Sequence, residues 1–168
     1  MKKYLYTDID YVLSLESEVH PVRTSWGLLS RFDAKAMKVY NEILQKTSAS
    51  IIISSDWKLH FSLADLQQIF FDFALADGYP IDVTPNLWGT KFKSLTQLEE
   101  CRATEILEHV KQHNPDSWVA IDDLNLSKWI SEDHFVHLTR CREGIKQSGK
   151  ASQVIKLLNI NDKPNNRS

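Results

Sequence analysis

The sequence is poor in cysteine, with only Cys101 and Cys141 among its 168 residues. Two thiols cannot form the framework of a disulfide-rich secreted domain, so we expect a reducing, cytoplasmic location. Long apolar runs are also missing, because none approaches the roughly 18 residues of a membrane-spanning helix. Asp8 follows Lys2-Lys3 too soon to leave room for the apolar core of a secretory signal. We therefore expect no membrane partner.

An excess of charge of one sign is absent as well. The formal net charge is −2, which gives no overall attraction to nucleic acid or to an anionic membrane, although a local basic patch is still compatible with it. Hydrophobic residues make up 42% of the chain, enough for the core of one globular domain. We expect a single domain over residues 1–160 and a frayed tail over 161–168.

Strand-like and helical patterns alternate along the chain. Apolar runs predict strands over 3–8, 50–54, 81–84, 118–121 and 135–138. Helical spacing predicts helices that begin after Asp33 and Ser62, and others over about 102–113 and 151–158. The order predicts an α/β fold of three layers, in which helices flank a central, mainly parallel sheet. Residues 14–33 and 58–80 are long enough for a flap or small lid, but not for a large cap domain.

Polar side chains follow three of the predicted strands. They are Asp8 and Asp10 after the first, Ser54 and Ser55 after the second, and Asp122 and Asp123 after the fourth. A parallel sheet brings these strand ends to one edge, where ligands bind in open α/β folds. Four carboxylates repel one another there unless a hard cation, Mg²⁺ first, offsets them. Hydroxyl and backbone N–H groups suit phosphate oxygens, so the pattern predicts a phosphoryl site with Mg²⁺.

These segments resemble the motifs of the haloacid-dehalogenase (HAD)-like phosphohydrolases. Asp8-Ile9-Asp10-Tyr11-Val12-Leu13 is similar to the first motif, DxDx(V/T)(L/V). Ile51-Ile52-Ile53-Ser54 is similar to the second motif, and Asp122-Asp123 to the acidic fourth. The resemblance implies that Asp8 is the nucleophile and Asp10 the general acid/base, and that Ser54 binds phosphate, with Ser55 beside it. It also implies Mg²⁺ ligands among Asp8, Asp10, Asp122 and Asp123, and leaves open which of the last two binds the metal.

The third motif of the superfamily is a Lys or Arg near a helix start before the fourth strand. Arg102 matches it best, and Lys91 or Lys93 is the alternative. A narrower resemblance links the chain to HAD domains of RNA-repair-associated (Swiss Army Knife) proteins. It rests on Ser54-Ser55-Asp56-Trp57-Lys58, Val83-Thr84-Pro85, Arg102 followed by Glu105-Ile106, and Thr139 with Gly144-Ile145. Tyr11 departs from the pattern, because Gly is common there, and it is expected to narrow the mouth of the pocket.

The resemblance implies a Mg²⁺-dependent phosphatase that forms an aspartyl-phosphate on Asp8. The expected partner is a phosphorylated small molecule or a nucleic-acid end, with no obligate protein partner. A basic rim for such a substrate is expected from Lys58, Lys91, Lys93, Arg140 and Arg142. The alternative is a catalytically decayed module that binds a phospho-ligand. A receiver-type signalling domain fits less well, because its adjacent acid pair normally follows the first strand.

Other patterns favour structural interpretations. Gly144–Ala151 nearly matches a P-loop, but Ala151 lacks the hydroxyl that binds Mg²⁺. Cys141-Arg142 resembles a cysteine phosphatase loop, but Gln147 stands six residues after the cysteine, where such a loop has an arginine. Trp57 is expected to pack rather than to stack on a base. His109 and His113 share a helix face, but without a third ligand they are expected to be surface histidines.

Overall fold

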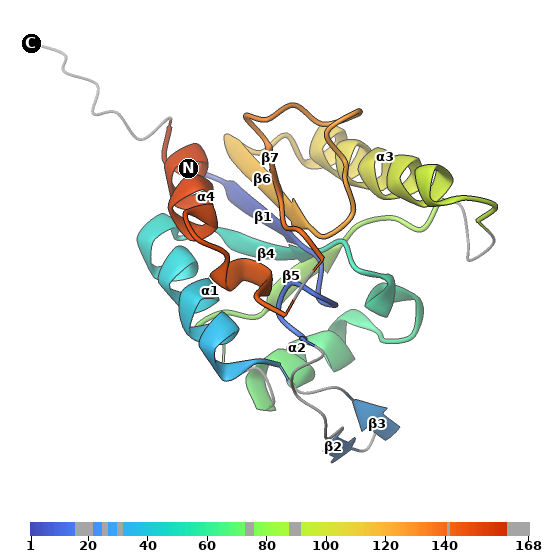
Figure 1. Cartoon of the computed structure of the whole chain (residues 1–168), viewed down its shortest axis with the longest axis vertical. Coiled ribbons are helices and arrows are strands. Elements are labelled where there is room, and N and C mark those ends of the chain that lie inside the picture. Colours follow the sequence, from blue (N-terminus) through green and yellow to red (C-terminus); the bar gives the residue numbers. More distant parts are fainter. Residues whose placement is uncertain are drawn as a thin grey trace, which may run out of the picture.

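The computed structural model describes residues 1–15, 22–24, 27–29, 32–72, 76–87, 92–140 and 142–160. A five-stranded sheet forms its centre, with the strand order β5-β4-β1-β6-β7 (Figure 1). The strands are β1 (Lys3–Thr7), β4 (Ser50–Ile53), β5 (Pro80–Val83), β6 (Ser117–Asp122) and β7 (Phe135–His137). Every neighbouring pair in this sheet is parallel. The predicted α/β architecture is therefore confirmed.

The sheet separates two cores because side chains alternate along each strand. Leu5, Ile51 and Val119 lie on one face, in a large apolar cluster with α1 (Ala34–Thr47), α2 (Leu63–Asp72) and α4 (Lys150–Leu158). Tyr6 and Ile52 point to the other face, where they pack against α3 (Leu95–His113) and the segment that joins β6 to β7. Figure 1 shows α3 on one side of the sheet and α1 with α4 on the other.

Helix α3 begins about two turns before the start expected at residue 102. Ser94 is its N-cap, and the Ser94 Oγ accepts a hydrogen bond from Gln97 N at 3.2 Å. The Gln97 side chain reaches back and accepts from Lys93 N at 2.8 Å. S-x-x-Q is the sequence pattern of a capping box, and here the Gln97 side chain bonds to the residue before the N-cap. Arg102 therefore lies in the interior of the helix and not near its start.

The segments that could form a flap or lid are partly described. Strands β2 (Val22–Thr24) and β3 (Gly27–Leu29) form an antiparallel hairpin inside the expected flap. The short 3₁₀ helix η1 (Asp56–Leu59) and α2 fill the second segment, and α2 buries Leu66, Ile69 and Phe70 in the larger core. Closure of either segment over the site stays a prediction. The tail over 161–168 lies outside the described residues.

The P-loop-like stretch has a packing role. It forms the 3₁₀ helix η2 (Gly144–Lys146) and the start of α4, and no strand precedes it directly among the described residues. Gly144 has φ of 51°, and a Cβ there would lie 2.3 Å from the Val12 carbonyl oxygen. Glycine is therefore required at this contact, which seats η2 against the loop after β1. Within the described part of the chain, no helix is both long and apolar enough to cross a membrane.

Candidate active site

The first strand ends at Thr7, and the chain then turns sharply. Asp8 N donates to Ile121 O at 3.1 Å, which fixes the Asp8 backbone beside β6. Leu13 N and Ser14 N both donate to Ile9 O at 2.9 Å, and these bonds close the turn. Tyr11 has φ of 58°, a left-handed conformation that favours glycine. The strand therefore ends at Thr7, and Asp10 lies in the turn that follows it.

Arg102 connects the acidic side chains at the edge of the sheet. Its Nη1 donates to Asp8 Oδ1 at 3.1 Å and to Asp122 Oδ2 at 2.9 Å, and its Nη2 donates to Asp56 Oδ1 at 2.8 Å. Burial would lower the pKa of Arg102, but Asp122 and Asp8 outweigh it and hold the pKa above its ordinary value. The structure thus brings Arg102, predicted as the cationic residue, into the site. Lys93 is exposed near the start of α3, and Lys91 lies outside the described residues.

Three carboxylates form a compact group. Asp8, Asp122 and Asp123 each offer one oxygen, and these oxygens lie within 4.8 Å of one another. Burial and the charge of Asp8 raise the pKa of Asp123 to about 6. Burial also raises the pKa of Asp122 well above its ordinary range, although Arg102 opposes the shift. A hard divalent cation would relieve this repulsion, so the set of oxygen donors fits Mg²⁺.

The two members of the acidic pair have different surroundings. Asp122 is the last residue of β6 and is fully buried, and its Oδ1 accepts from Leu124 N at 2.9 Å. Asp123 lines the cavity of the site. This placement favours Asp123 as the metal ligand and Asp122 as the partner of Arg102.

Asp10 lies apart from the acidic group, at the exposed mouth of the site. Its Oδ2 accepts a hydrogen bond from Trp57 Nε1 at 3.0 Å. Desolvation raises the pKa of Asp10; the hydrogen bond from Trp57 opposes the shift, and the charge of Asp8 adds to it. Asp10 therefore holds a proton more readily than an ordinary aspartate, as a general acid must. Its side chain as a metal ligand stays a prediction.

Ser54 and Ser55 are both buried, but they differ in their contacts. The Ser54 side chain is fully buried. Among the described residues, its Oγ is the one buried side-chain N or O atom that has no hydrogen-bond partner. Buried polar atoms are usually satisfied, so this hydroxyl has bonding capacity that a phosphate oxygen could use. Ser55 lines the cavity, and its Oγ accepts from Trp57 N at 3.4 Å, which caps η1. The phosphate-binding role of either serine stays a prediction.

Trp57 and Lys58 are interior residues. Trp57 packs between Phe32 and Phe61, at ring-centroid distances of 5.8 and 5.5 Å, so it fits the packing role expected for it. Lys58 was expected on a basic rim, and that expectation is wrong. Its side chain is 4% exposed and pairs with Glu105, while Nζ also donates to Thr84 Oγ1 at 2.7 Å. Desolvation lowers the pKa of Lys58.

The cavity has a volume of about 380 Å³ and opens above the strand ends. Its lining residues are Asp8, Asp10, Tyr11, Ser14, Leu15, Ser55, Asp56, Leu98, Arg102, Asp123, Leu124 and Arg140. At the mouth, the Arg140 guanidinium lies 3.8 Å from the centroid of the Tyr11 ring and 3.8 Å from Asp123 Oδ2. Tyr11 and Arg140 therefore form one wall of the opening.

Sequence reasoning missed Asp56 and the hydrogen bond from Trp57 to Asp10. Both residues follow Ser55 in η1, and the turn of η1 directs one toward Arg102 and the other toward Asp10. The sequence signal that could have identified both residues was their position just after the end of β4. Cys141 lies outside the described residues.

The expectation of a surface histidine is wrong for His109, whereas the side chain of His113 is 27% exposed. His109 is 2% exposed, and its Nδ1 shares a hydrogen bond with the Tyr6 hydroxyl at 2.8 Å. Desolvation holds the pKa of His109 below its ordinary value. A third side chain, Asp82 of β5, faces both rings. These three residues form a second polar cluster, distinct from the acidic cavity.

The parallel sheet, the DxD turn and the acidic pair define a HAD-like protein. The chain matches the family described as "HAD domain in Swiss Army Knife RNA repair proteins" over residues 4–148 and belongs to that family. Membership implies a phosphohydrolase type of function. The curated proteins and the solved structures contain no significant match.

Proposed function

We propose that the protein is a Mg²⁺-dependent phosphatase that acts on a phosphomonoester through a phosphorylated Asp8. The observation that carries the proposal is the Arg102 bridge between Asp8 and Asp122 at the floor of the open cavity. The Arg102 guanidinium holds the Asp8 carboxylate in place, as an attacking nucleophile requires. The same guanidinium provides positive charge where a phosphoryl group would bind.

In the first half-reaction, an Asp8 carboxylate oxygen attacks phosphorus and the bond from phosphorus to the ester oxygen breaks. Asp10 donates its proton to that oxygen, and the alcohol leaves. In the second half-reaction, water attacks the phosphorus of the aspartyl-phosphate and gives its proton to Asp10. The bond between phosphorus and Asp8 then breaks, which releases inorganic phosphate and restores the site.

The mechanism requires Asp10 to carry a proton that it can donate, and its surroundings support this role. Asp8 contacts Arg102, whereas Asp10 is partly desolvated, and desolvation raises its pKa. Trp57 holds the Asp10 carboxyl in place through Nε1. Pairs of carboxyl groups with separated pKa values are a common basis for acid–base chemistry at one site.

Mg²⁺, held by Asp8 and Asp123 and supported by the nearby Asp122, would neutralise charge on the phosphoryl group. Residues of the chain would orient the nucleophile and bind the phosphate oxygens. Arg102 orients Asp8, the Ser54 hydroxyl is available to a phosphate oxygen, and Leu98 and Leu124 add apolar surface to the cavity lining. Asp123 must release its proton before a cation can bind, so binding should weaken below about pH 6.

The substrate class is proposed as a nucleotide or a phosphorylated nucleic-acid end. The proposal is supported by the open cavity, by Tyr11 and Arg140 at its mouth, and by the family of RNA-repair-associated domains. An aromatic ring with an adjacent guanidinium offers stacking and charge to a nucleotide. Of the expected basic rim, Arg140 lines the cavity, and Arg142 is an exposed residue two positions further along the chain.

The test is phosphate release with Mg²⁺ from nucleotides, from 3′- and 5′-phosphorylated oligonucleotides, from sugar phosphates and from a generic aryl phosphate. We expect turnover that needs Mg²⁺ and that Asp8→Asn abolishes while the circular dichroism spectrum is unchanged. Asp116→Asn, at an exposed carboxylate that accepts from Lys2 N, is the matched control and should keep full activity. Undiminished turnover in Asp8→Asn would contradict the mechanism. Mg²⁺-dependent binding without turnover across the panel would instead favour a decayed binding module.

A further inference from the structure

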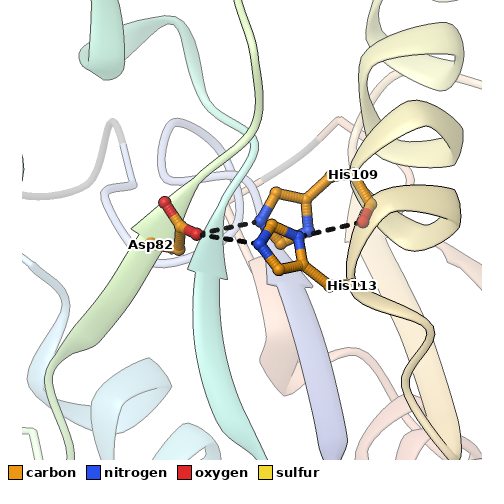
Figure 2. Close-up of side chains that lie close together, drawn as sticks. All are labelled: Asp82, His109 and His113. Carbon is orange, nitrogen blue, oxygen red and sulfur yellow. Dashed lines mark hydrogen bonds and ion pairs between the residues drawn. The ribbon is translucent and has the colours of Figure 1, made fainter.

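A second polar cluster lies between the edge strand β5 and helix α3. It consists of Asp82, His109 and His113 (Figure 2). Figure 2 shows the carboxylate of Asp82 directed from the strand toward both imidazole rings, which project from successive turns of the helix. The cluster shares no residue with the acidic cavity.

The three side chains present one ligand atom each to a common point. Asp82 Oδ2 lies 3.3 Å from His109 Nε2 and 3.7 Å from His113 Nε2, and all three atoms lie within 4.8 Å of one another. Ligand atoms about 2.0–2.1 Å from a tetrahedral Zn²⁺ would be roughly 3.3–3.4 Å apart. Histidines at i and i+4 of a helix are also a common zinc-binding pair. The spacing therefore needs only small side-chain movements to hold such an ion.

Hydrogen bonds at the other ring nitrogens orient both histidines. His113 Nδ1 lies 3.1 Å from the His109 carbonyl oxygen, an acceptor, so Nδ1 carries the proton and Nε2 of a neutral ring has a lone pair. His109 Nδ1 lies 2.8 Å from the Tyr6 hydroxyl, which can accept from it. Metal-binding histidines usually have such a partner at the nitrogen away from the metal. In the neutral His113 ring the nitrogen that faces Asp82 therefore has the lone pair, and in His109 it has the lone pair in the tautomer whose Nδ1 donates to the Tyr6 hydroxyl.

The cluster is also accessible. The Asp82 side chain is 41% exposed and that of His113 is 27% exposed, whereas His109 is buried. Solvent can therefore reach the common point from the side of Asp82 and provide a fourth ligand. Two imidazoles with one carboxylate suit Zn²⁺ better than Mg²⁺, which prefers oxygen ligands.

We propose that Asp82, His109 and His113 form a Zn²⁺ site in which water is the fourth ligand. The ion would join β5, an edge strand of the sheet, to α3. The same helix carries Arg102 into the acidic cavity, so zinc at this point would fix the helix on which the phosphate site depends. This inference does not depend on the proposed phosphatase function, because binding can be measured without turnover.

The test uses the whole chain, freed of metal with a chelator and titrated with Co²⁺ as a spectroscopic substitute for Zn²⁺. We expect the visible absorption of four-coordinate Co²⁺, its displacement by Zn²⁺, and a rise in the melting temperature with Zn²⁺. Asp82→Asn removes the carboxylate charge but keeps an Oδ1 that can accept from Val83 N. His113→Ala removes a partly exposed imidazole ring. Loss of a residue that only hydrogen-bonds to a metal ligand typically weakens metal binding about 10–100-fold. Each of these two substitutions removes a ligand and should weaken Co²⁺ binding by more than that. Tyr6→Phe, which removes such a hydrogen-bonding partner of His109, should weaken binding within that range of about 10–100-fold.

Two control variants separate this site from others. His60→Ala removes an exposed histidine, and Asp123→Asn alters the acidic cavity. Both should keep the Co²⁺ absorption. The proposal is overturned if no four-coordinate absorption develops, if the absorption survives in folded Asp82→Asn, or if Asp123→Asn removes it. Far-ultraviolet circular dichroism verifies folding, and Asp82→Asn decides the outcome should His113→Ala fail to fold.

Discussion

The two faces of the central sheet are built from different chemistry. Toward α1, α2 and α4, the buried contacts are almost entirely apolar, with Leu5, Ile43 and Val154 among them. Toward α3, the helix buries Arg102, Glu105 and His109 against the sheet, and each has a partner from another element. Buried charges are poor stabilisers compared with well-packed apolar groups. The α3 face therefore holds more buried charge beside its apolar cluster, and the opposite face is the more apolar of the two.

The three buried residues Arg102, Glu105 and His109 extend along α3 from one polar cluster to the other. Arg102 reaches the acidic cavity, Glu105 holds Lys58 and accepts from Leu87 N at 2.9 Å, and His109 meets Asp82. These residues recur at helical spacing, so they lie on one side of the helix. Substitutions on this side should therefore alter activity or metal binding more than those on the apolar face do.

The largest effect is expected from Arg102→Met. We expect kcat to fall by about 10³-fold, because the variant loses both the charge and the orientation of Asp8. Arg102→Lys retains the charge but not the planar fork, so it should recover only part of the activity. Steady-state kinetics with an aryl phosphate measure both variants, and thermal denaturation shows whether each is folded at the assay temperature. Equal activity in Arg102→Met and the wild type would contradict the view that the charged residues on the α3 face matter more for activity than the apolar residues on the other face.

A smaller effect, of another kind, is expected from Ile43→Ala on α1. The side chain is fully buried, so its truncation should lower the free energy of unfolding by about 3 kcal/mol. Urea denaturation measures this change. Since Ile43 lies in the apolar cluster away from the cavity, kcat of the folded protein should be unchanged. A large fall in kcat at full folding would show that the apolar face also shapes the site.

The smallest effect is expected from Asp33→Ala at the N-cap of α1. Asp33 Oδ1 accepts from Ala36 N at 2.7 Å, and the loss of such a cap lowers the free energy of unfolding by about 1 kcal/mol at pH 7. Burial would raise the pKa of Asp33, but the bond from Ala36 and the Lys146 ammonium at 3.1 Å lower it overall. A lowered pKa in the folded state means that the stabilisation is complete above the unfolded pKa of about 4 and is lost as the pH falls through the folded value.

Denaturation of wild type and Asp33→Ala as a function of pH measures this difference. The gap between them should close under acid conditions, and Asp33→Asn, which keeps a capping oxygen, should lose less stability than Asp33→Ala at neutral pH. A gap that widened toward acid pH would contradict the assigned direction of the pKa shift.

The sequence predicted the strand ends well because apolar runs and the acids after them are local signals. Asp8, Asp122 and Asp123 came together through the parallel order of β1 and β6, which follows from alternation of strands and helices. The start of α3 was missed although Ser94 and Gln97 match the sequence pattern of a capping box.

The second cluster could not be predicted from local patterns. Asp82 meets His109 only because β5 pairs with β4 at the edge of the sheet and α3 crosses the same face. Neither the edge position nor the register between Ile52 and Asp82 is encoded in the spacing of the histidines. The contact of Trp57 with Asp10 likewise depends on how η1 folds back toward the turn after β1.

The most direct test of the account is a rapid acid quench of the protein during turnover of an aryl phosphate with Mg²⁺, followed by mass spectrometry of its peptides. The account predicts one added phosphoryl group on the peptide that contains Asp8, and its absence in Asp8→Asn. Turnover with the phosphoryl group on another residue, or with no phosphorylated peptide and full activity in Asp8→Asn, would contradict it.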